Sequence, residues 1–332
     1  MKIGICMPSD DPEIFFKEIV GYLSLQHQLE YFKHNSLETP FLKERIYRYL
    51  SRRNLDHFLS ENDVVFFEWA SQLLVEATRL PKKCGIVTRL HRYEMYHWAN
   101  QINWQIVDRI ILVSRAKEKE FLSRFPSEVN KTRVIPEAIS LQKFKPSQKQ
   151  YSGDIGILCD LIPRKRIYDL LLAFYELNKI SNNFRLHIAG GPNPAHMDYF
   201  HSIEDIVQRL KLENKVTFYG GITNPWDWYS NIDIFISNSY SEGLQVAPME
   251  AMASGCYVLS HYWDGADELL PFDQLYFSSQ ELISKILDYS SLSDSVKSNK
   301  KALMQSIVKD NFDVEQIQVK INDVITEVGT LL

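Results

Sequence analysis

The chain has 332 residues, and at roughly 100 to 200 residues per domain this length favours two domains. Hydrophobic residues make up 45% and charged residues 24%, a balance that excludes a disordered chain. The net charge of -5 is distributed unevenly, because residues 1–150 carry 23 basic and 18 acidic side chains and the remainder carry 14 and 24. This split argues against nucleic acid as a partner, and it allows the first half to face an anionic surface or acceptor.

The N-terminus leads directly into an apolar segment, Lys2–Met7, without the pattern of a secretory signal. No stretch approaches about 18 uncharged apolar residues, the length of a membrane span. We therefore expect a cytoplasmic location, with peripheral contact at the inner face of the membrane as a further option. Four widely spaced cysteines are expected to be buried, reduced thiols rather than metal ligands or disulfides: Cys6, Cys84, Cys159 and Cys256.

In the first half, short apolar runs alternate with amphipathic stretches, which predicts β-α-β units and a parallel sheet. The expected strands are Lys2–Met7, Asp63–Trp69, Cys84–Leu90, Arg109–Ser114 and Arg133–Pro136. Helical spacing is found between them at Phe41–Leu59 and Arg115–Phe125. We therefore expect a Rossmann-like, doubly wound domain over residues 1–148.

A second series of the same kind follows the polar segment Lys143–Ser152, which we interpret as the linker. Its expected strands are Ile155–Leu158, Arg185–Ala189, Lys215–Tyr219, Ile232–Ser237 and Tyr257–Ser260. We expect a second Rossmann-like domain over residues 149–310, with a cleft between the two domains in which ligands meet the carboxyl ends of the strands.

The chain is expected to be helical from Glu281 onward. Apolar residues recur at helical spacing in its last part, at Val314, Ile317, Ile321, Val324, Ile325 and Val328. The periodicity predicts one apolar face to bury. We therefore expect a closing helix over residues 311–332 that packs back on the first domain.

The most informative stretch for chemistry runs from Ser239 to Gly255. It follows an apolar strand, turns through Gly243 and then has a helical pattern. Such a turn aims backbone N–H groups and the positive end of a helix dipole at one point, which suits a phosphate. Glu242 and Glu250 bracket the turn, and a carboxylate beside an anion site is suited to accept hydrogen bonds from hydroxyls. Phosphate together with hydroxyls indicates a nucleotide sugar.

This stretch resembles the E-x7-E motif of retaining GT-B glycosyltransferases, family 4 in particular, whose fuller pattern is E-G-F-G-L-P-x-x-E-A-M-A-x-G. The chain departs from it at Gln245 and Ala247, where that family has Gly and Pro. The retained letters are Glu242, Gly243, Glu250, Ala251, Met252, Ala253 and Gly255.

The resemblance implies a GT-B fold and assigns roles to these residues. Glu242 would contact a hydroxyl of the transferred sugar, and Glu250 would bind the ribose hydroxyls. The donor would also contact the intervening turn, at Gly243, Leu244, Gln245 and Val246.

The segment Leu161–Lys165 resembles the G-R-L-x-P-x-K segment of the same family. The resemblance implies that Lys165 neutralises the leaving diphosphate. The Arg of that pattern falls on Asp160, which reverses the charge. Either Arg164 or Arg166 compensates or phosphate binding is weaker, and the sequence leaves these alternatives open.

Three short motifs support the resemblance, although each is an ordinary turn when taken singly. Gly190-Gly191-Pro192 matches the glycine turn that lies against the nucleotide. Phe218-Tyr219-Gly220 resembles the F-x-G near the base. Gly265-Ala266-Asp267-Glu268 resembles the G-x-x-E turn that closes the donor pocket.

In the first domain, Val87–His91 ends a strand, where the family commonly places a histidine near the transferred sugar. His91 is therefore the first-domain candidate for catalysis, and a structural histidine is the alternative. The family's glycine-rich loop after the first strand is replaced here by Pro8–Pro12.

The stretch Phe41–Asn54 carries basic residues around an apolar stripe. The basic residues are Lys43, Arg45, Arg48, Arg52 and Arg53, and the stripe is Leu42, Ile46, Tyr49 and Leu50. A solvated face over a core stripe is one interpretation. Docking to an anionic membrane is the other, since family members with lipid-linked acceptors often dock through the first domain.

The resemblance implies a retaining, metal-independent glycosyltransferase that moves a sugar from a UDP-sugar or GDP-sugar to a glycan or a lipid-linked acceptor. No separate cofactor is expected, because the nucleotide sugar is the substrate. Two alternatives stay open. One is a nucleotide-sugar-binding protein without catalysis, and the other, ranked last, is a sugar-phosphate or nucleotide-sugar isomerase.

Overall fold

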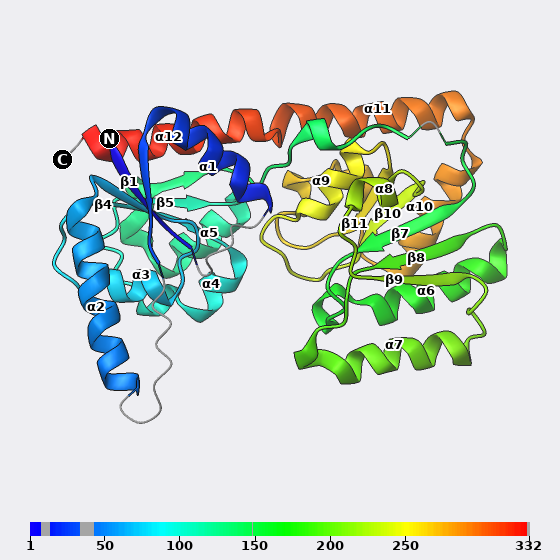
Figure 1. Ribbon diagram of the computed structural model, residues 1–332. Helices are drawn as coiled ribbons and strands as arrows, with labels where there is room; N and C mark the ends of the chain where they lie inside the picture. The colour runs from blue at the N-terminus through cyan, green and yellow to red at the C-terminus, as the bar shows by residue number, and fades with distance from the viewer. Residues whose placement is uncertain (8–13, 34–42, 148, 331–332) are drawn as a thin grey trace. The chain divides into compact units, whose positions relative to one another are not determined.

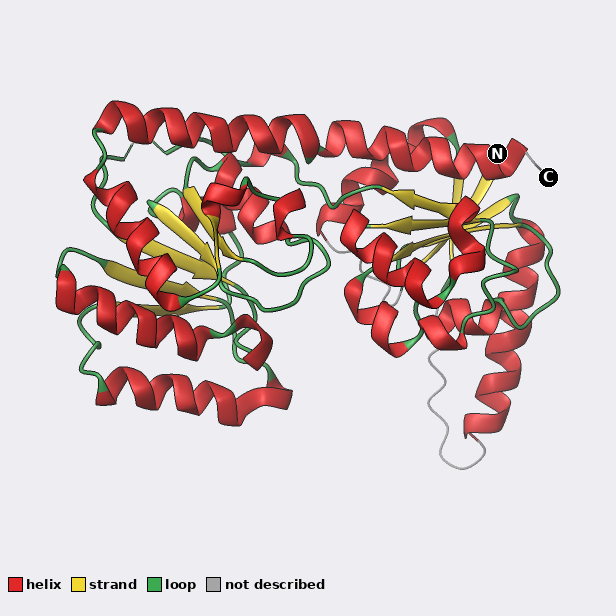
Figure 2. Ribbon diagram, turned by 180° about the vertical axis from the view of Figure 1, so that it is seen from behind, coloured by secondary structure: helices red, strands yellow, loops and turns green. Residues whose placement is uncertain are grey.

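The computed structural model describes residues 1–7, 14–33, 43–147 and 149–330, and it divides into two compact α/β units. Unit 1 consists of Met1–Glu137 and Val314–Leu332, and unit 2 of Ala138–Asp313. Each unit holds one six-stranded sheet with helices packed on its faces, as the yellow strands and red helices of Figure 2 show. The strands pair in parallel. The central strands β3 (Val64–Phe67), β4 (Gly85–Leu90) and β10 (Ile234–Ser237) are buried along their whole length, which explains why they appear as continuous apolar runs in the sequence.

The sheet of unit 1 has the order β2-β1-β3-β4-β5-β6. Its strands β1, β4 and β5 are labelled in Figure 1. The order reverses between β1 and β3, as it does in flavodoxin-like sheets. Its strands are β1 (Lys2–Cys6), β2 (Gln28–Tyr31), β3 (Val64–Phe67), β4 (Gly85–Leu90), β5 (Arg109–Leu112) and β6 (Thr132–Val134). The α-helices of this unit are α1 (Ile14–Gln26), α2 (Lys43–Glu61), α3 (Gln72–Ala77), α4 (Arg92–His97), α5 (Arg115–Arg124) and α12 (Val314–Thr330).

The sheet of unit 2 has the order β12-β11-β10-β7-β8-β9. This is the Rossmann arrangement, in which the order reverses between the first strand and the fourth, here β7 and β10. The strands are β7 (Asp154–Leu158), β8 (Arg185–Ala189), β9 (Val216–Gly220), β10 (Ile234–Ser237), β11 (Tyr257–His261) and β12 (Leu275–Tyr276). The α-helices are α6 (Ile167–Ile180), α7 (Met197–Arg209), α8 (Pro225–Tyr229), α9 (Val246–Ala253), α10 (Ser279–Ser291) and α11 (Asp294–Asn311).

Short 3-10 helices complete both units. Those of unit 1 are η1 (Ala99–Gln101) and η2 (Pro126–Lys131). Those of unit 2 are η3 (Leu141–Lys143), η4 (Pro163–Lys165), η5 (Pro194–His196), η6 (Ala266–Glu268) and η7 (Phe272–Gln274).

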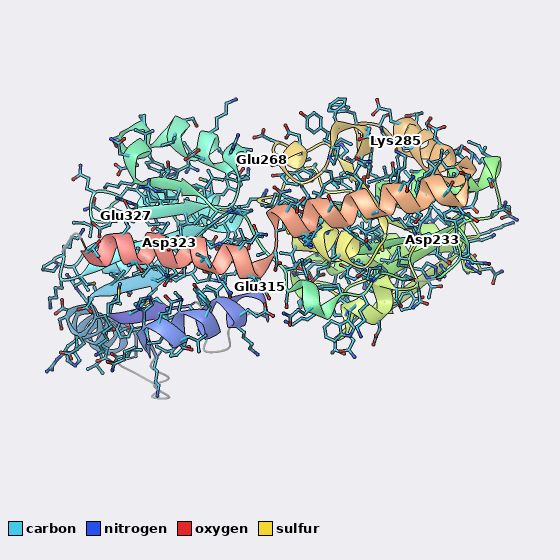
Figure 3. The ribbon with its side chains drawn as sticks, turned by 90° about the horizontal axis from the view of Figure 1, so that it is seen from above. Asp233, Glu268, Lys285, Glu315, Asp323 and Glu327 are labelled. Atoms are coloured by element: carbon cyan, nitrogen blue, oxygen red, sulfur yellow. The ribbon has the colours of Figure 1, made fainter. Side chains whose placement is uncertain are left out.

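Helix α12 completes the core of unit 1 and packs against α1, β3 and β4. Figure 1 shows it beside α1. The six apolar positions expected on one face, from Val314 to Val328, are all buried, which confirms that prediction. Glu327, labelled in Figure 3, accepts hydrogen bonds from Nε of Arg109 at 3.1 Å and from Nη2 of Arg133 at 3.2 Å. The last helix therefore binds both to the apolar core and to the basic side chains of β5 and β6.

The expected Rossmann-like fold class is confirmed by these two sheets, and ten of the strands lie where the sequence predicts them. Two strands were missed: β2, and the two-residue β12. The polar segment Lys143–Ser152 belongs to unit 2, and the chain passes between the units after Glu137 and after Asp313.

Candidate donor site

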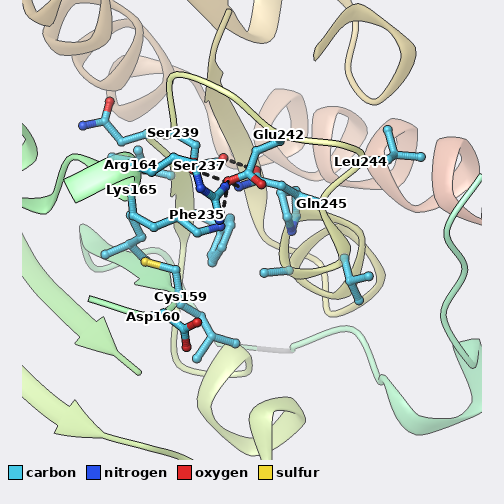
Figure 4. A pocket seen from close by; sticks show the side chains of 17 residues that line it. Cys159, Asp160, Arg164, Lys165, Phe235, Ser237, Ser239, Glu242, Leu244 and Gln245 are labelled. Carbon is cyan, nitrogen blue, oxygen red and sulfur yellow. Dashed lines mark hydrogen bonds and ion pairs between the residues drawn. The ribbon is translucent and has the colours of Figure 1, made fainter. Parts of the chain in front are cut away.

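A pocket of about 320 Å³ lies in unit 2 where the loops after β7 and β10 meet the start of α9 (Figure 4). The carboxyl ends of the two strands at which the order of a parallel sheet reverses form a crevice, and ligands of such sheets bind there. The pocket is therefore at the position that the topology favours. Its lining consists of Ile157, Leu158, Cys159, Asp160, Arg164, Lys165, Phe235, Ile236, Ser237, Asn238, Ser239, Glu242, Leu244, Gln245, Val246, Ala247 and Pro248.

Two cations and one carboxylate form the polar centre of the pocket. Nζ of Lys165 lies 2.7 Å from Oε1 of Glu242, and Nη1 of Arg164 binds the same oxygen. The guanidinium of Arg164 also donates to the backbone carbonyl of Ser241 at 3.0 Å. Arg164 and Lys165 therefore lie together in the pocket, and both are anchored to the turn that carries Glu242.

A left-handed backbone conformation at Arg166 directs these two cations. Arg166 has a φ of 52°, ends η4 and precedes α6. This region is unfavourable for a residue with a side chain, so it requires support. Nδ2 of Asn238 supplies it by donating to the Arg166 carbonyl at 2.8 Å. The Arg166 side chain lies 3.6 Å from Asp169, outside the pocket lining, so the structure assigns the second cation to Arg164.

The pKa of Glu242 is lowered although the side chain is buried. Burial by itself raises the pKa of a carboxyl, but the charges of Lys165 and Arg164 and the hydrogen bonds from Lys165 and Ser239 outweigh it. Glu242 is therefore ionised at neutral pH. It holds the two cations in place until an anionic ligand competes for them.

Gln245 stands where the family that the sequence resembles has glycine, and its side chain fills part of the pocket. Its Nε2 donates to Oε1 of Glu242 at 2.8 Å and to Oγ of Ser239 at 3.0 Å, and its Oε1 accepts from Ser237. Gln245 is the residue before α9, and its carboxamide points to these partners instead of capping the helix. The positive end of the α9 dipole thus faces the pocket, where it favours an anion.

Glu250 lies one turn further along α9, beyond the pocket lining, and faces Tyr229. The Tyr229 hydroxyl donates to Oε2 of Glu250 at 2.9 Å and lies 3.1 Å from the carbonyl of Ala247. Burial raises the pKa of Glu250 to about 7, opposed by this hydrogen bond and by the charge of Lys143. The site thus contains two carboxyls with opposite shifts, Glu242 lowered and Glu250 raised.

The glycines expected at the donor site shape its border instead of lining it. Gly190 has a φ of 119°, and a Cβ on it would lie 1.8 Å from the carbonyl oxygen of Cys159. Glycine is therefore required for β8 to end beside the loop that carries Asp160 and Lys165. Gly191 accepts from the N–H of Leu161 at 3.1 Å, which fixes the same loop, and Gly243 is buried in the turn after Glu242.

The structure thus brings most of the predicted donor residues together in one pocket: Arg164, Lys165, Glu242, Leu244, Gln245 and Val246. Ser237 and Asn238 also line the pocket and were not predicted as site residues. A signal was present, because small polar residues stand at the end of the buried strand β10 and directly after it. Tyr229, the partner of Glu250, had no local signal, since the two are 21 positions apart in the sequence.

The cysteines agree only in part with the expectation of buried thiols. Cys6, Cys84 and Cys256 are buried, whereas Cys159 is half-buried and lines the pocket. Burial nonetheless raises the pKa of Cys159 to about 12, so this thiol is a poor nucleophile at neutral pH. In the described part of the chain, no group of three or more His, Cys, Asp or Glu side chains is arranged to hold a metal ion.

His91 lies in unit 1, at the end of β4, where it precedes α4. It stacks on Trp69, and its Nε2 lies 3.1 Å from Oε1 of Glu137.

The helix α2, for which membrane docking was considered, begins at Lys43, while Leu42 and the side chains of residues 43–49 lie outside the described residues. Arg52 and Arg53 are exposed on it. None of the helices in the described ranges combines the length and apolarity of a membrane span.

The two Rossmann-like units define a GT-B fold, and comparison with solved structures agrees. The chain is similar to Anabaena HepE in complex with UDP and glucose, with a TM-score of 0.80 at 19% identity, covering 98% of this chain and 99% of that one. It is also similar to sucrose-phosphate synthase from Thermosynechococcus elongatus, with a TM-score of 0.75 at 16% identity and complete coverage of both chains. At these identities the likeness establishes the fold.

Residues 142–271, which include the whole pocket, match the family model described as "Glycosyl transferases group 1". Alpha-monoglucosyldiacylglycerol synthase of Streptococcus pneumoniae is 29% identical over 203 residues, 55% of this chain and 44% of that protein. A phosphatidylinositol N-acetylglucosaminyltransferase subunit of Arabidopsis thaliana is 25% identical over 182 residues, 53% of this chain and 39% of that protein. The similarity therefore spans less than half the length of these curated relatives.

Proposed function

We propose that the chain is a glycosyltransferase that moves a sugar from a nucleoside-diphosphate sugar to an acceptor hydroxyl. The observation that carries the proposal is the joint position of Arg164, Lys165 and the start of α9 around one pocket at the reversal point of the unit 2 sheet. Two cations and a helix N-terminus suit a diphosphate. The family match over this segment and the GT-B fold support the same function.

The donor is proposed to bind with its diphosphate against Arg164, Lys165 and the turn Gly243–Val246. The ion pairs of Glu242 with these two cations then weaken, and Glu242 accepts a hydrogen bond from a hydroxyl of the transferred sugar. Glu250 accepts from the ribose hydroxyls, a role open to it because Tyr229 occupies only one of its oxygens. Gly190 and Gly191 hold the loop that carries Asp160 and Lys165 beside the end of β8.

The proposed reaction proceeds with retention and without a bound metal. The bond between the anomeric carbon and the diphosphate oxygen breaks, and the acceptor oxygen forms the new bond on the same face of the sugar. The acceptor proton passes to the departing phosphate. Catalysis then depends on positioning and on stabilisation of the diphosphate charge by Lys165, Arg164 and the α9 dipole.

A UDP-sugar is the first donor to test, because the solved complexes of Anabaena HepE contain UDP. A GDP-sugar is the second. The curated relatives act, by their names, on diacylglycerol and phosphatidylinositol, so a lipid-linked acceptor is proposed beside a soluble glycan. Peripheral contact with an anionic membrane is part of this proposal, and co-sedimentation with anionic vesicles at low salt tests it.

The test of function is a transfer assay followed by mass spectrometry. Purified protein is incubated with UDP-glucose, UDP-N-acetylglucosamine or GDP-mannose and with vesicles containing diacylglycerol or phosphatidylinositol, or with a panel of soluble glycosides. The proposal predicts that one of the acceptors gains the mass of one sugar residue. The product should be absent with Glu242→Gln and present with Glu213→Gln, which changes an exposed glutamate of unit 2. Donor binding without any product would favour the non-catalytic binding protein. Conversion of the donor without an acceptor would favour an isomerase or a hydrolase.

A further inference from the structure

A cluster of five buried ionisable side chains lies at the carboxyl edge of the unit 1 sheet. Glu68 follows β3, Arg89 and His91 come from the end of β4, Glu94 lies in the first turn of α4, and Glu137 follows β6. Carboxyl ends of parallel strands share one edge, so the fold brings together residues that are up to 69 positions apart. Burying this many charges lowers the stability of the fold unless the charges are paired.

Arg89 is fully buried and divides its guanidinium between two carboxylates. Its Nη1 donates to Oε1 of Glu68 at 3.1 Å, and its Nη2 donates to Oε2 of Glu137 at 2.7 Å and to the carbonyl of Pro136 at 3.1 Å. One positive charge therefore faces two carboxylates, with Glu94 as a third nearby. Burial raises the pKa of both Glu68 and Glu94, so the cluster is balanced either by a proton on one of these carboxyls or by a second cation.

His91 is placed to be that cation. Its Nε2 lies 3.1 Å from Oε1 of Glu137 and 3.9 Å from Oε1 of Glu68, and its Nδ1 lies 3.8 Å from Oε2 of Glu94. Burial lowers the pKa of His91 and Arg89 opposes its charge, but Glu137 and Glu68 outweigh both, so the pKa is raised above its usual value. Among the described residues, neither ring nitrogen has a well-aligned hydrogen bond, and both nitrogens are buried.

The ring of His91 stacks on Trp69, with centroids 4.4 Å apart and planes inclined by 29°. A cation over an indole face is attracted by the ring quadrupole, and the attraction increases when the pair is desolvated. Trp69 is half-buried and follows Glu68 directly, beside the point where the strand order of unit 1 reverses between β1 and β3. A ligand of this sheet is expected at that point.

We propose that His91 is a positioning residue that works as an imidazolium, held by the carboxylates of Glu137, Glu68 and Glu94, and that it fixes the indole of Trp69 at the carboxyl edge of the unit 1 sheet. His91 acts through Trp69, because its own ring nitrogens are buried. Trp69 is then placed to contact the acceptor, and this step alone rests on the proposed function.

The inference fixes the direction of a pH dependence. The imidazolium is present below the raised pKa of His91 and is lost as the pH rises through it. Burial also raises the pKa of Glu68, to about 7, despite Arg89 and His91, so that ionisation of Glu68 and loss of the His91 proton are coupled events. Glu137 has a lowered pKa and remains ionised throughout this range.

The charge of His91 is measured by NMR titration of the histidine ring resonances, with His91→Gln to assign the signal. We expect His91 to titrate above 6.5, and its pKa to fall by about 1 unit or more in Glu137→Gln. Glu137→Asp should recover part of this fall, and Glu61→Gln, which changes an exposed glutamate of unit 1, should leave it unaltered. Titration of wild-type His91 at or below 6.5 would overturn the proposal.

The contact with Trp69 is measured by fluorescence, because a protonated imidazole quenches a stacked indole. The difference in emission between wild type and Trp69→Phe reports the fluorescence of Trp69. It should increase as the pH rises through the pKa that NMR gives for His91, and Glu137→Gln should move this transition to lower pH. A flat difference over that range would also overturn the proposal. Thermal melting of each variant shows whether it is folded.

These readouts need neither donor nor acceptor, so they separate the inference from the proposed function. If sugar transfer is found, the alkaline limb of its pH profile should move with the His91 pKa in Glu137→Gln, and Trp69→Ala should lower kcat/KM more than Trp69→Phe. If no transfer is found while NMR and fluorescence behave as expected, the proposed function fails and the His91–Trp69 pair stands.

Discussion

The carboxyl edges of the two parallel sheets carry charged clusters of opposite design. In unit 2 a single oxygen of Glu242 receives Arg164, Lys165 and Gln245, and the group lines a pocket. In unit 1 a single guanidinium, that of Arg89, is divided between Glu68 and Glu137 and is fully buried. The unit 2 pocket has an excess of cations, to which an anionic ligand can bind. The unit 1 cluster has an excess of carboxylates, and because these are buried, only protein groups can pair with them.

The comparison also shows how little the charge of a whole region says about its site. Residues 1–150 have more basic than acidic side chains, yet their buried cluster has three carboxyls and two basic groups. The acidic remainder of the chain provides the pocket with Arg164 and Lys165 at its centre. A diphosphate is therefore expected in unit 2, whatever the net charges of the two halves.

The largest effect is expected from Arg89→Met. Removing one partner of a buried charge network leaves the others uncompensated, which costs about 3–5 kcal/mol of unfolding free energy. Urea unfolding measures it, with Arg79→Met as the control because Arg79 is exposed in the same unit. A loss below about 1 kcal/mol would mean that the unit 1 cluster is hydrated and resembles the unit 2 pocket more closely than the structure indicates.

Lys165→Met should affect the ligand far more than the fold. The variant removes a cation that is proposed to stabilise the leaving diphosphate, so kcat should fall by about 10²- to 10³-fold. Stability should change little, because Glu242 keeps Arg164 and Gln245 as partners. Steady-state kinetics and thermal melting together check this. Equal kinetics in wild type and variant would remove Lys165 from the mechanism.

Glu250→Gln should make stability less dependent on pH. The pKa of Glu250 is raised to about 7, so its ionisation opposes folding increasingly as the pH rises from the unfolded value of 4.5 through 7. The amide keeps an oxygen for Tyr229 and carries no charge. At pH 8.5 the variant should therefore be about 1–3 kcal/mol more stable than wild type, and near pH 4.5 the two should converge.

The smallest effect is expected from Gln245→Ala. The carboxamide makes hydrogen bonds with Ser237, Ser239 and Glu242, but these groups line an accessible pocket in which water can replace it. The loss should be about 0.5–1 kcal/mol. If urea unfolding gave a loss as large as that for Arg89→Met, the contrast between an accessible pocket and a buried cluster would fail.

Apolar runs were sufficient to predict ten of the twelve strands in the described part of the chain, most of which are buried on both faces, although β9 is largely exposed. They missed β2, whose four residues are only partly buried or exposed, and β12, which has two residues. The resemblance to family 4 also pointed to Lys165, Glu242 and Gln245, all of which line the pocket. It could not choose between Arg164 and Arg166, because that choice depends on the left-handed backbone at Arg166.

The partners of His91 were beyond the reach of sequence reasoning for a related reason. Glu68 and Glu137 are separated from it by 23 and 46 positions, and they meet it only because β3, β4 and β6 end at the same edge of one sheet. The sequence predicted the histidine at a strand end. Strand order and the reach of Arg89 determine which carboxylates surround it.

The most direct test of the account is an isothermal titration of UDP, followed by GDP and ADP, into wild type, Lys165→Met and Lys211→Met. Lys211 is an exposed lysine of the same unit, away from the pocket, and serves as the matched control. If the pocket is the donor site, one nucleotide binds wild type and Lys211→Met equally and binds Lys165→Met at least about tenfold more weakly, since a hydrogen bond to a charged group contributes about 1.5–3 kcal/mol. Equal affinity in all three proteins, or no binding of any nucleotide to wild type, would contradict it.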